Sequence, residues 1–199
     1  AKAQTEALAR SVRITKETVA ANILNRAFNS SYTYADGKEL LATDHPNVSG
    51  GTYANELTTA ADFSQVAIEQ ALIDIAGFTD DKGLPIQAMA QKLCLPRQLM
   101  HEVRRVLESP LESGNSNNDI NVLRGVFPGG VAINHYLTDP DAWFIKTNVT
   151  NGMKHYERRA DEFAPAEEDY DTDNLKYKAT ARFSFTADDV KSMFGSTGA

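Results

Sequence analysis

The stretch that decides the fold lies near the C-terminus and reads Leu175-Lys176-Tyr177-Lys178-Ala179-Thr180-Ala181-Arg182-Phe183-Ser184-Phe185. Apolar and polar side chains alternate without a break, which is the period-two pattern of a β-strand with one buried face and one wet face. We therefore predict a strand over 175–185, with Phe183 and Phe185 facing the core. Shorter strands are predicted upstream, at 93–95, 130–136, 142–147 and 153–159.

The N-terminal half shows helical periodicity instead. Residues 5–29 contain no Gly or Pro, and five side chains fall within about 80° of a helical wheel: Leu8, Val12, Thr15, Val19 and Ile23. A second helix is predicted at 63–76, with Asp62 as its N-cap. A third begins after Pro96 and ends before Pro110. Helices followed by mostly antiparallel strands indicate an α+β protein.

Two stretches between these elements have little periodicity. Residues 42–61 carry the turn formers Asp44-His45-Pro46-Asn47 and Gly50-Gly51, and residues 112–119 are almost wholly polar. Both are predicted as surface loops. A loop as long as the first is a functional hint in itself.

Length and composition exclude several classes of protein. The chain has 199 residues, of which 42% are hydrophobic and 24% charged, values typical of a globular protein of one large or two small domains. Its apolar runs are far shorter than the ~18–20 residues of a membrane span, so we expect no membrane association. A single cysteine, Cys94, excludes an internal disulfide framework and a multi-cysteine zinc site.

The net charge of −7 is concentrated in one segment. Residues 161–174 contain no Lys or Arg and seven acids: Asp161, Glu162, Glu167, Glu168, Asp169, Asp171 and Asp173. The rest of the chain is balanced, with 20 acidic and 20 basic residues. Such a chain lacks the basic face of a general nucleic-acid binder. The segment is predicted to be a solvated acidic loop, or one that docks on a basic surface.

Three groups of residues could serve as reaction or metal sites. Cys94 and His101 suggest a nucleophile pair, but an inert buried thiol and an exposed imidazole are about nine times more probable. Asp169, Asp171 and Asp173 mimic the start of a calcium loop. The sixth and twelfth positions of that loop, however, are Asn174 and Thr180 instead of Gly and Glu.

His135 with Asp139 or Asp141 could form an acid/base group, but the sequence places no nucleophile beside them. Asp139-Pro140-Asp141 is more simply a turn between strands. The glycine pairs Gly50-Gly51 and Gly129-Gly130 do not fit a phosphate-binding loop. No catalytic, cofactor-binding or metal site is predicted from the residues, and no cofactor.

Several stretches resemble the major capsid (head) proteins of tailed bacteriophages, in an order and spacing that cover nearly the whole chain. They are ETVAANILNRAFN at 17–29, LLATDHP at 40–46, LTTAAD at 57–62, DDKGLPI at 80–86, NNDIN at 117–121, YLTDPDAWF at 136–144 and KYKA at 176–179. The resemblance implies the phage-capsid fold, which encapsulin shells share. That fold joins a long spine helix and an antiparallel sheet in a peripheral domain to a second, axial domain.

On this resemblance, residues 1–39 hold the spine helix of the peripheral domain and residues 40–140 form the axial domain. Residues 141–199 supply the return strands into the peripheral domain and the C-terminus. Family members carry an N-terminal arm and an extended hairpin before the spine helix, so we expect the given sequence to be a C-terminal portion of its protein.

The implied function is that of a structural subunit, not an enzyme. It would self-assemble into pentamers and hexamers of an icosahedral head shell in the host cytoplasm and remain in the virion. The shell would enclose double-stranded DNA without binding it specifically, with scaffold, portal and decoration proteins as further partners. Two alternatives stay open: an encapsulin-type shell around protein cargo, and, remotely, a small acidic hydrolase using His135.

Overall fold

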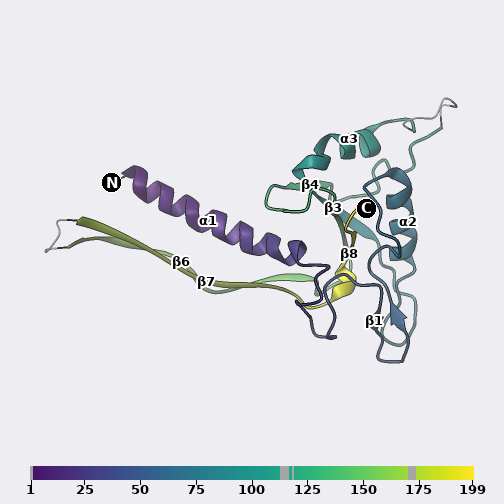
Figure 1. The fold of residues 1–199 in the computed structure, drawn as a ribbon, viewed down its shortest axis with the longest axis horizontal. Coiled ribbons are helices and arrows are strands. Elements are labelled where there is room, and N and C mark those ends of the chain that lie inside the picture. The colour runs from purple at the N-terminus through teal and green to yellow at the C-terminus, as the bar shows by residue number, and fades with distance from the viewer. Residues whose placement is uncertain (1, 113–116, 118, 170–173) are drawn as a thin grey trace.

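The computed structural model describes residues 2–112, 117, 119–169 and 174–199. It has two parts, a body around a four-stranded sheet and an arm that projects from one side of the body (Figure 1). The arm consists of helix α1 (Lys2–Asn25) lying along a long antiparallel hairpin of β6 (Met153–Asp169) and β7 (Asn174–Ala187). The mixture of helices and sheet agrees with the predicted α+β class.

The body contains the remaining elements, in the order β1 (His45–Pro46), β2 (Thr52–Tyr53), α2 (Gln65–Ala76), β3 (Ala90–Pro96), η1 (Arg97–Leu99), α3 (Met100–Glu108), β4 (Val131–Asn134), β5 (Trp143–Thr147), η2 (Val190–Ser192) and β8 (Met193–Ser196). Its main sheet has the strand order β4-β3-β5-β8, in which β3 and β4 are parallel and the other pairs antiparallel. β1 and β2 form a separate short pair.

A hydrophobic core lies on each face of this sheet. Trp143 and Ile145 point into the larger core, which α2 and α3 cover with side chains such as Ile68 and Val103. Phe144, one position out of phase, points into the smaller core. There it meets the C-terminal end of α1, the segment 40–41 and η2. Strand β5 is therefore buried on both faces, and its side chains alternate between the two cores. In this way it connects the body to the base of the arm.

Helix α1 confirms the first predicted helix but not all of its predicted buried stripe. Leu8 and Val12 are half-buried, whereas Thr15 is exposed and Val19 is 39% exposed. The half-buried position in this part of the helix is instead Lys16. Its ammonium lies over the Phe183 ring, 5.4 Å from the centroid, so the aliphatic stem of a charged residue fills the expected apolar position.

Strand β7 confirms the alternation over 175–185, with one correction. The side chains from Tyr177 to Phe185 on one face are half-buried, and most on the other are exposed. Phe183 and Phe185, however, belong to neither core and lie on the arm. Phe185 stacks on His155, with ring centroids 4.5 Å apart. A thin helix-on-hairpin layer buries an aromatic ring less completely than a core does.

The acidic segment is only partly the loop that was predicted. Strand β6 runs ten residues beyond the predicted end at 159, and residues 161–169 pair with β7. Backbone pairing and the ion pair of Asp161 with Lys16 (2.7 Å) hold this part in an extended conformation. Asp171 and Asp173 of the possible calcium loop lie outside the described residues, whereas its positions from Asn174 to Thr180 belong to β7.

Two further local predictions were wrong. The N-cap of α2 is Ser64, whose hydroxyl accepts the N–H of Ala67 (3.2 Å); Asp62 instead accepts the N–H of Ala199. The strand β8 was missed altogether because it is short and contains Gly195. A Cβ at Gly195 would lie 2.8 Å from the carbonyl oxygen of Trp143, so the pairing of β8 with β5 requires glycine there.

Candidate functional site

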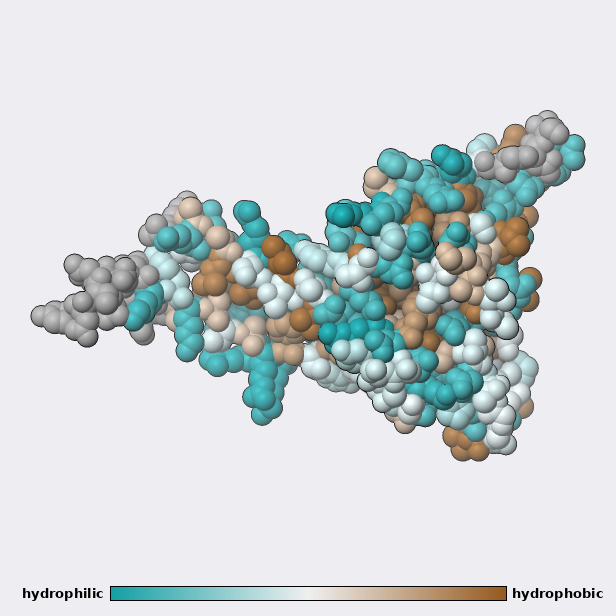
Figure 2. Space-filling model, in the orientation of Figure 1, coloured by the Kyte–Doolittle hydropathy of each residue, from teal (hydrophilic) through white to brown (hydrophobic). Residues whose placement is uncertain are grey.

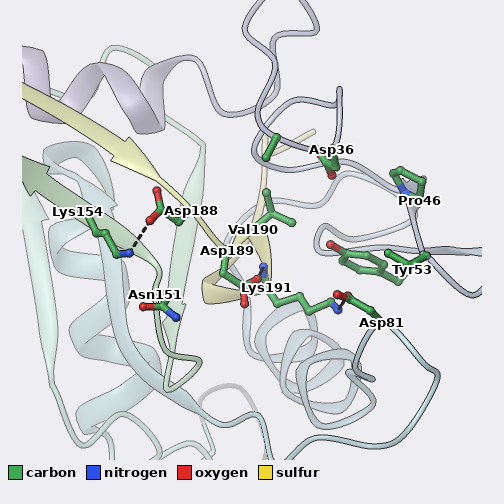
Figure 3. Close-up of a pocket in the computed structure, with 12 residues that line it drawn as sticks. Asp36, Pro46, Tyr53, Asp81, Asn151, Lys154, Asp188, Asp189, Val190 and Lys191 are labelled. Atoms are coloured by element: carbon green, nitrogen blue, oxygen red, sulfur yellow. Dashed lines mark hydrogen bonds and ion pairs between the residues drawn. The ribbon is translucent and has the colours of Figure 1, made fainter.

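A hollow lies where the arm enters the body. It has a volume of about 630 Å³ and is lined by loop residues, by η2 and by the start of β6 (Figure 3). Its polar lining is mostly charged, with the acids Asp36, Asp81, Asp188 and Asp189 facing the bases Lys154 and Lys191. Segments from four parts of the chain meet here.

The two lysines are both paired. Lys191, although nearly buried, places its ammonium 3.0 Å from Asp81 and 4.6 Å from the centre of the Tyr53 ring. Lys154 forms an ion pair with Asp188, and that hydrogen bond raises the pKa of Lys154. A buried ammonium needs such partners, because an unpaired charge in a low-dielectric site is costly.

Tyr53 forms one wall of the hollow. Burial raises the pKa of its phenol, and the nearby carboxylates of Asp36, Asp189 and Asp81 raise it further. The phenol therefore stays neutral over the physiological range. A neutral ring under the Lys191 ammonium contributes a cation–π contact and no acid/base chemistry.

A buried polar network lies directly behind this wall. The amide of Asn55 donates to the carbonyl oxygens of Leu40 (2.8 Å) and Val190 (2.9 Å), so its oxygen is left to accept. That oxygen accepts the N–H of Ala42 and lies 3.0 Å from Nε2 of His45, which must therefore carry a proton. Nδ1 of His45 lies 2.5 Å from the carboxylate of Asp36. The network ties the loop after α1 to η2.

A second charged contact holds the arm together. Lys16 of α1 lies 2.7 Å from Asp161 and 3.3 Å from Glu157, both on β6. The hydrogen bond to Asp161 is the main cause of the raised pKa of Lys16. Like the pairs in the hollow, these contacts join segments distant in sequence. The paired charges serve to position elements, and they leave no nucleophile beside a free base among the residues described.

The residues weighed as reaction sites are not assembled into one. Cys94 faces the smaller core, whereas α3, which carries His101, covers the opposite face of the sheet. Burial raises the pKa of the Cys94 thiol, which disfavours the thiolate. His135 is exposed, and the Asp139 carboxylate accepts the N–H groups of Asp141 and Ala142 as a turn residue.

Neither glycine pair has phosphate-loop geometry. Gly50 and Gly51 both have positive φ in the turn between β1 and β2, and Gly129 packs against the backbone of β3. Across the described part of the chain, no group of three metal-ligating side chains comes together. In that same part, no helix has the length and apolar character needed to cross a membrane.

Sequence reasoning missed the residues that make this junction. Lys191 and Asn55 are buried polar residues in segments without periodicity, and nothing in their sequence neighbourhood marks them. The sequence predicts a turn at Asp81 and a long loop that contains His45 and Tyr53. The one available signal was the length of the 42–61 loop.

The comparisons with known proteins agree with a structural role. The chain matches the family model described as phage capsid protein over residues 2–194, nearly its full length. It therefore belongs to the phage capsid protein family, and the expected resemblance is confirmed. Membership makes it a capsid or shell protein, and it implies a structural role and a place in the virion. No curated protein matches the sequence.

Two solved structures are similar to it. A phage-related protein from Bordetella bronchiseptica has a TM-score of 0.52 at 10% identity, covering 96% of this chain and 62% of that one. A virus-like particle from Pyrococcus furiosus has a TM-score of 0.42 at 12% identity, covering 71% of this chain and 55% of that one. The chain thus spans less than two thirds of the length of either protein. The Bordetella likeness shows a shared fold.

Proposed function

We propose that this chain is the shell-forming part of a major capsid protein, a subunit that self-assembles into the icosahedral head enclosing a phage genome. The observation that carries the proposal is the match to the phage capsid family over residues 2–194. The projecting arm supports it as well, because an elongated subunit offers more surface to neighbouring copies than a compact one of equal length (Figure 1).

The proposed division of the chain follows the arm and the body. Residues 1–39 would form the peripheral domain with the spine helix α1, and residues 40–140 the axial domain. Within 141–199, β6 and β7 would return into the peripheral domain along α1. In the structure β5 pairs with β3 and β8 pairs with β5, so this last part also contributes to the sheet of the body.

The partners proposed are, first, other copies of the same chain in rings of five and six. Scaffold, portal and decoration proteins would join during assembly in the host cytoplasm, and double-stranded DNA would be enclosed rather than specifically bound. No enzymatic activity or cofactor is proposed. The paired lysines and the buried His45 network would act as fixed joints between arm and body.

Electron microscopy of the purified full-length protein, in a range of salt concentrations and with or without its scaffold, tests the proposal. Closed icosahedral particles are expected, and a protein that stays monomeric under all these conditions would contradict it. The rival function is an encapsulin-type shell. Particles from infected cells that contain DNA support the phage head, whereas particles filled with protein and free of DNA support the rival.

A further inference from the structure

The body presents two helical faces of opposite charge. Residues 39–81 contain no Lys or Arg and eight acids: Glu39, Asp44, Glu56, Asp62, Glu69, Asp74, Asp80 and Asp81. Helix α2 lies inside this range. Helix α3 and the preceding turn η1 instead expose three arginines against two glutamates. On the body surface, the acidic residues around α2 are therefore separated from the arginines around α3.

The outward face of α2 is apolar at its centre and acidic at its margins. Val66 is 75% exposed and Ile73 is 65% exposed, and both lie on the side opposite to the core residues Ala67, Ile68, Ala71 and Ile75. Figure 2 shows hydrophobic residues on this edge of the body. Asp62, Glu69 and Asp74 flank them, and none of the three has a basic partner among the described residues.

The outward face of α3 has the complementary chemistry. Arg97, Arg104 and Arg105 are exposed and outnumber the acids Glu102 and Glu108. In the part of the chain that the structure covers, the three arginines form no ion pair.

Apolar side chains adjoin this basic face. Ile120 is 76% exposed and Val122 is 63% exposed. The residue between them, Asn121, is fastened to the end of α3 by hydrogen bonds from its amide to the carbonyl oxygens of Val106 (2.6 Å) and Ser109 (3.0 Å). The α3 face thus joins exposed apolar groups to a rim in which three arginines outnumber two glutamates, with the acid Asp119 beside Ile120. The α2 face joins its apolar groups to a rim of acids alone.

The topology separates the two faces within one chain. Both helices cover the same side of the sheet of order β4-β3-β5-β8. Helix α2 contacts β8 at one edge, and α3 continues from β3, beside β4 at the other edge. The complementary surfaces therefore belong to opposite edges of the body and are available to different neighbours.

Building on the proposed shell function, we propose that the α2 face of one copy docks on the α3 face of the next copy. The contact joins two different surfaces, so it is heterologous, and such a contact closes into a ring when its rotation permits. The exposed apolar side chains on both faces supply burial. The charged rims fix orientation, since α2-to-α2 or α3-to-α3 contacts would bring like charges together.

Charge reversal in the full-length protein tests the contact. One variant carries Glu69→Arg and Asp74→Arg on α2, and the other carries Arg104→Glu and Arg105→Glu on α3. Each alone gives a subunit whose two faces have the same sign. Since like charges in contact cost several kcal/mol, each variant should form at least about tenfold less assembled protein at low salt.

Mixing the two variants is the decisive step. In an equal mixture, each basic face can meet an acidic face of the other variant, so alternating copies should assemble again into rings of six. A ring of five cannot alternate throughout and keeps one contact between like charges. A chain with all four substitutions should assemble by itself. Isologous contacts predict no such rescue. Sedimentation of the assembled fraction and electron micrographs give the readout.

A cross-linking experiment covers the case in which a reversed variant fails to fold. In a Cys94→Ser background, Ile73→Cys and Arg105→Cys are combined and the assembled protein is treated with a short bis-maleimide. Ladders of linked copies are expected from the double-cysteine chain and none from either single-cysteine chain. Dimers from Ile73→Cys alone, or no ladder at all, would overturn the proposed contact.

The outcomes separate this inference from the function on which it rests. If the parent assembles and both reversed variants assemble equally well at low salt, the contact is wrong and the capsid function stands. If the parent never assembles under any condition, both fall. If the reversed variants and their mixture all fail, the cross-linking result decides.

Discussion

Asn55 is the residue on which the base of the arm depends. Its side chain makes four hydrogen bonds in a fully buried site, to Leu40, Ala42, His45 and Val190. Asn55→Ala leaves these groups without partners, and each buried unsatisfied group costs about 1–3 kcal/mol. We expect the free energy of unfolding to fall by at least about 3 kcal/mol, measured by urea denaturation of the unassembled subunit.

The matched control for Asn55 is Gln98→Ala, which removes an exposed amide on η1. It should change the free energy of unfolding by less than about 0.5 kcal/mol. Equal destabilisation by the two substitutions would show that the buried network contributes nothing special.

Glu56 should make stability depend on pH. Burial, with the nearby carboxylates of Glu39 and Asp44, raises its pKa from 4.5 to about 7. Because the folded protein holds this proton more tightly than the unfolded chain, the protein loses stability as pH rises from 4.5 to about 7. Glu56→Gln mimics the protonated form. We expect it to melt like the parent below pH 4.5 and at a higher temperature than the parent above pH 7.

A direct titration checks the cause of the Glu56 effect. The carboxyl resonance of Glu56, followed by NMR, should have its midpoint near pH 7. A midpoint near 4.5, or a variant that melts below the parent at pH 8, would contradict the prediction.

The sequence was least informative about individual buried polar residues. The 42–61 segment was predicted to be a surface loop from its turn formers, and it does contain turns at Gly50 and Gly51. Yet His45 and Asn55 inside it are fully buried. Periodicity reports on repeated apolar positions, and it carries no signal for a polar side chain that is buried because its own hydrogen bonds are satisfied.

Among the elements, those with a strong period were predictable. The alternation around Phe183 predicted β7, and the long run without Gly or Pro predicted α1. Strand β8 has four residues and no alternation, so only its pairing with β5 defines it. The N-cap of α2 was misplaced by two residues, since Asp62 and Ser64 are equally good caps and the tertiary bond of Asp62 to Ala199 decides between them.

Phe183 tests the contact between α1 and the hairpin. Phe183→Asp places a third carboxylate near Lys16, which already pairs with Glu157 and Asp161. It also removes apolar area from the layer between helix and hairpin. We expect α1 to detach, so its amide hydrogens should exchange at least about tenfold faster in the unassembled subunit, and assembly should fail.

Lys178→Gln is the control for Phe183→Asp, because Lys178 lies on the exposed face of the same strand. It should leave both hydrogen exchange and assembly close to those of the parent. Equal behaviour of the two variants would mean that the assignment of the faces of β7 is wrong.

For the whole molecule, the arrangement of arm and body explains why short sequence stretches identified the protein family but predicted no functional site. The stretches that resemble capsid proteins include 17–29 at the end of α1 and just after it, 40–46 beside the hollow and 136–144 leading into β5. They come together at the junction of arm and body around the smaller core. Because this joint is built from segments distant in sequence, the patterns that mark it are short and scattered along the chain.

The last prediction concerns the acidic end of the arm. Two of its acids, Asp161 and Glu162, pair with Lys16 and Arg159 of the same chain. Glu167, Glu168 and Asp169 end β6, at the end of the hairpin farthest from the body (Figure 1). An acidic tip on a projecting arm is placed to reach a basic surface on a neighbouring subunit. We therefore expect this tip to lie at a subunit boundary.

Neutralising the tip with Glu167→Gln, Glu168→Gln and Asp169→Asn should then lower the yield or the melting temperature of shells at low salt. Exposed pairs contribute only about 0–1 kcal/mol each, but a shell repeats every contact at each equivalent boundary. At about 1 M salt the screening length falls to about 3 Å, so the difference between variant and parent should shrink. If the variant assembles and melts like the parent at low salt, the tip is solvated on one face of the shell and holds no neighbour.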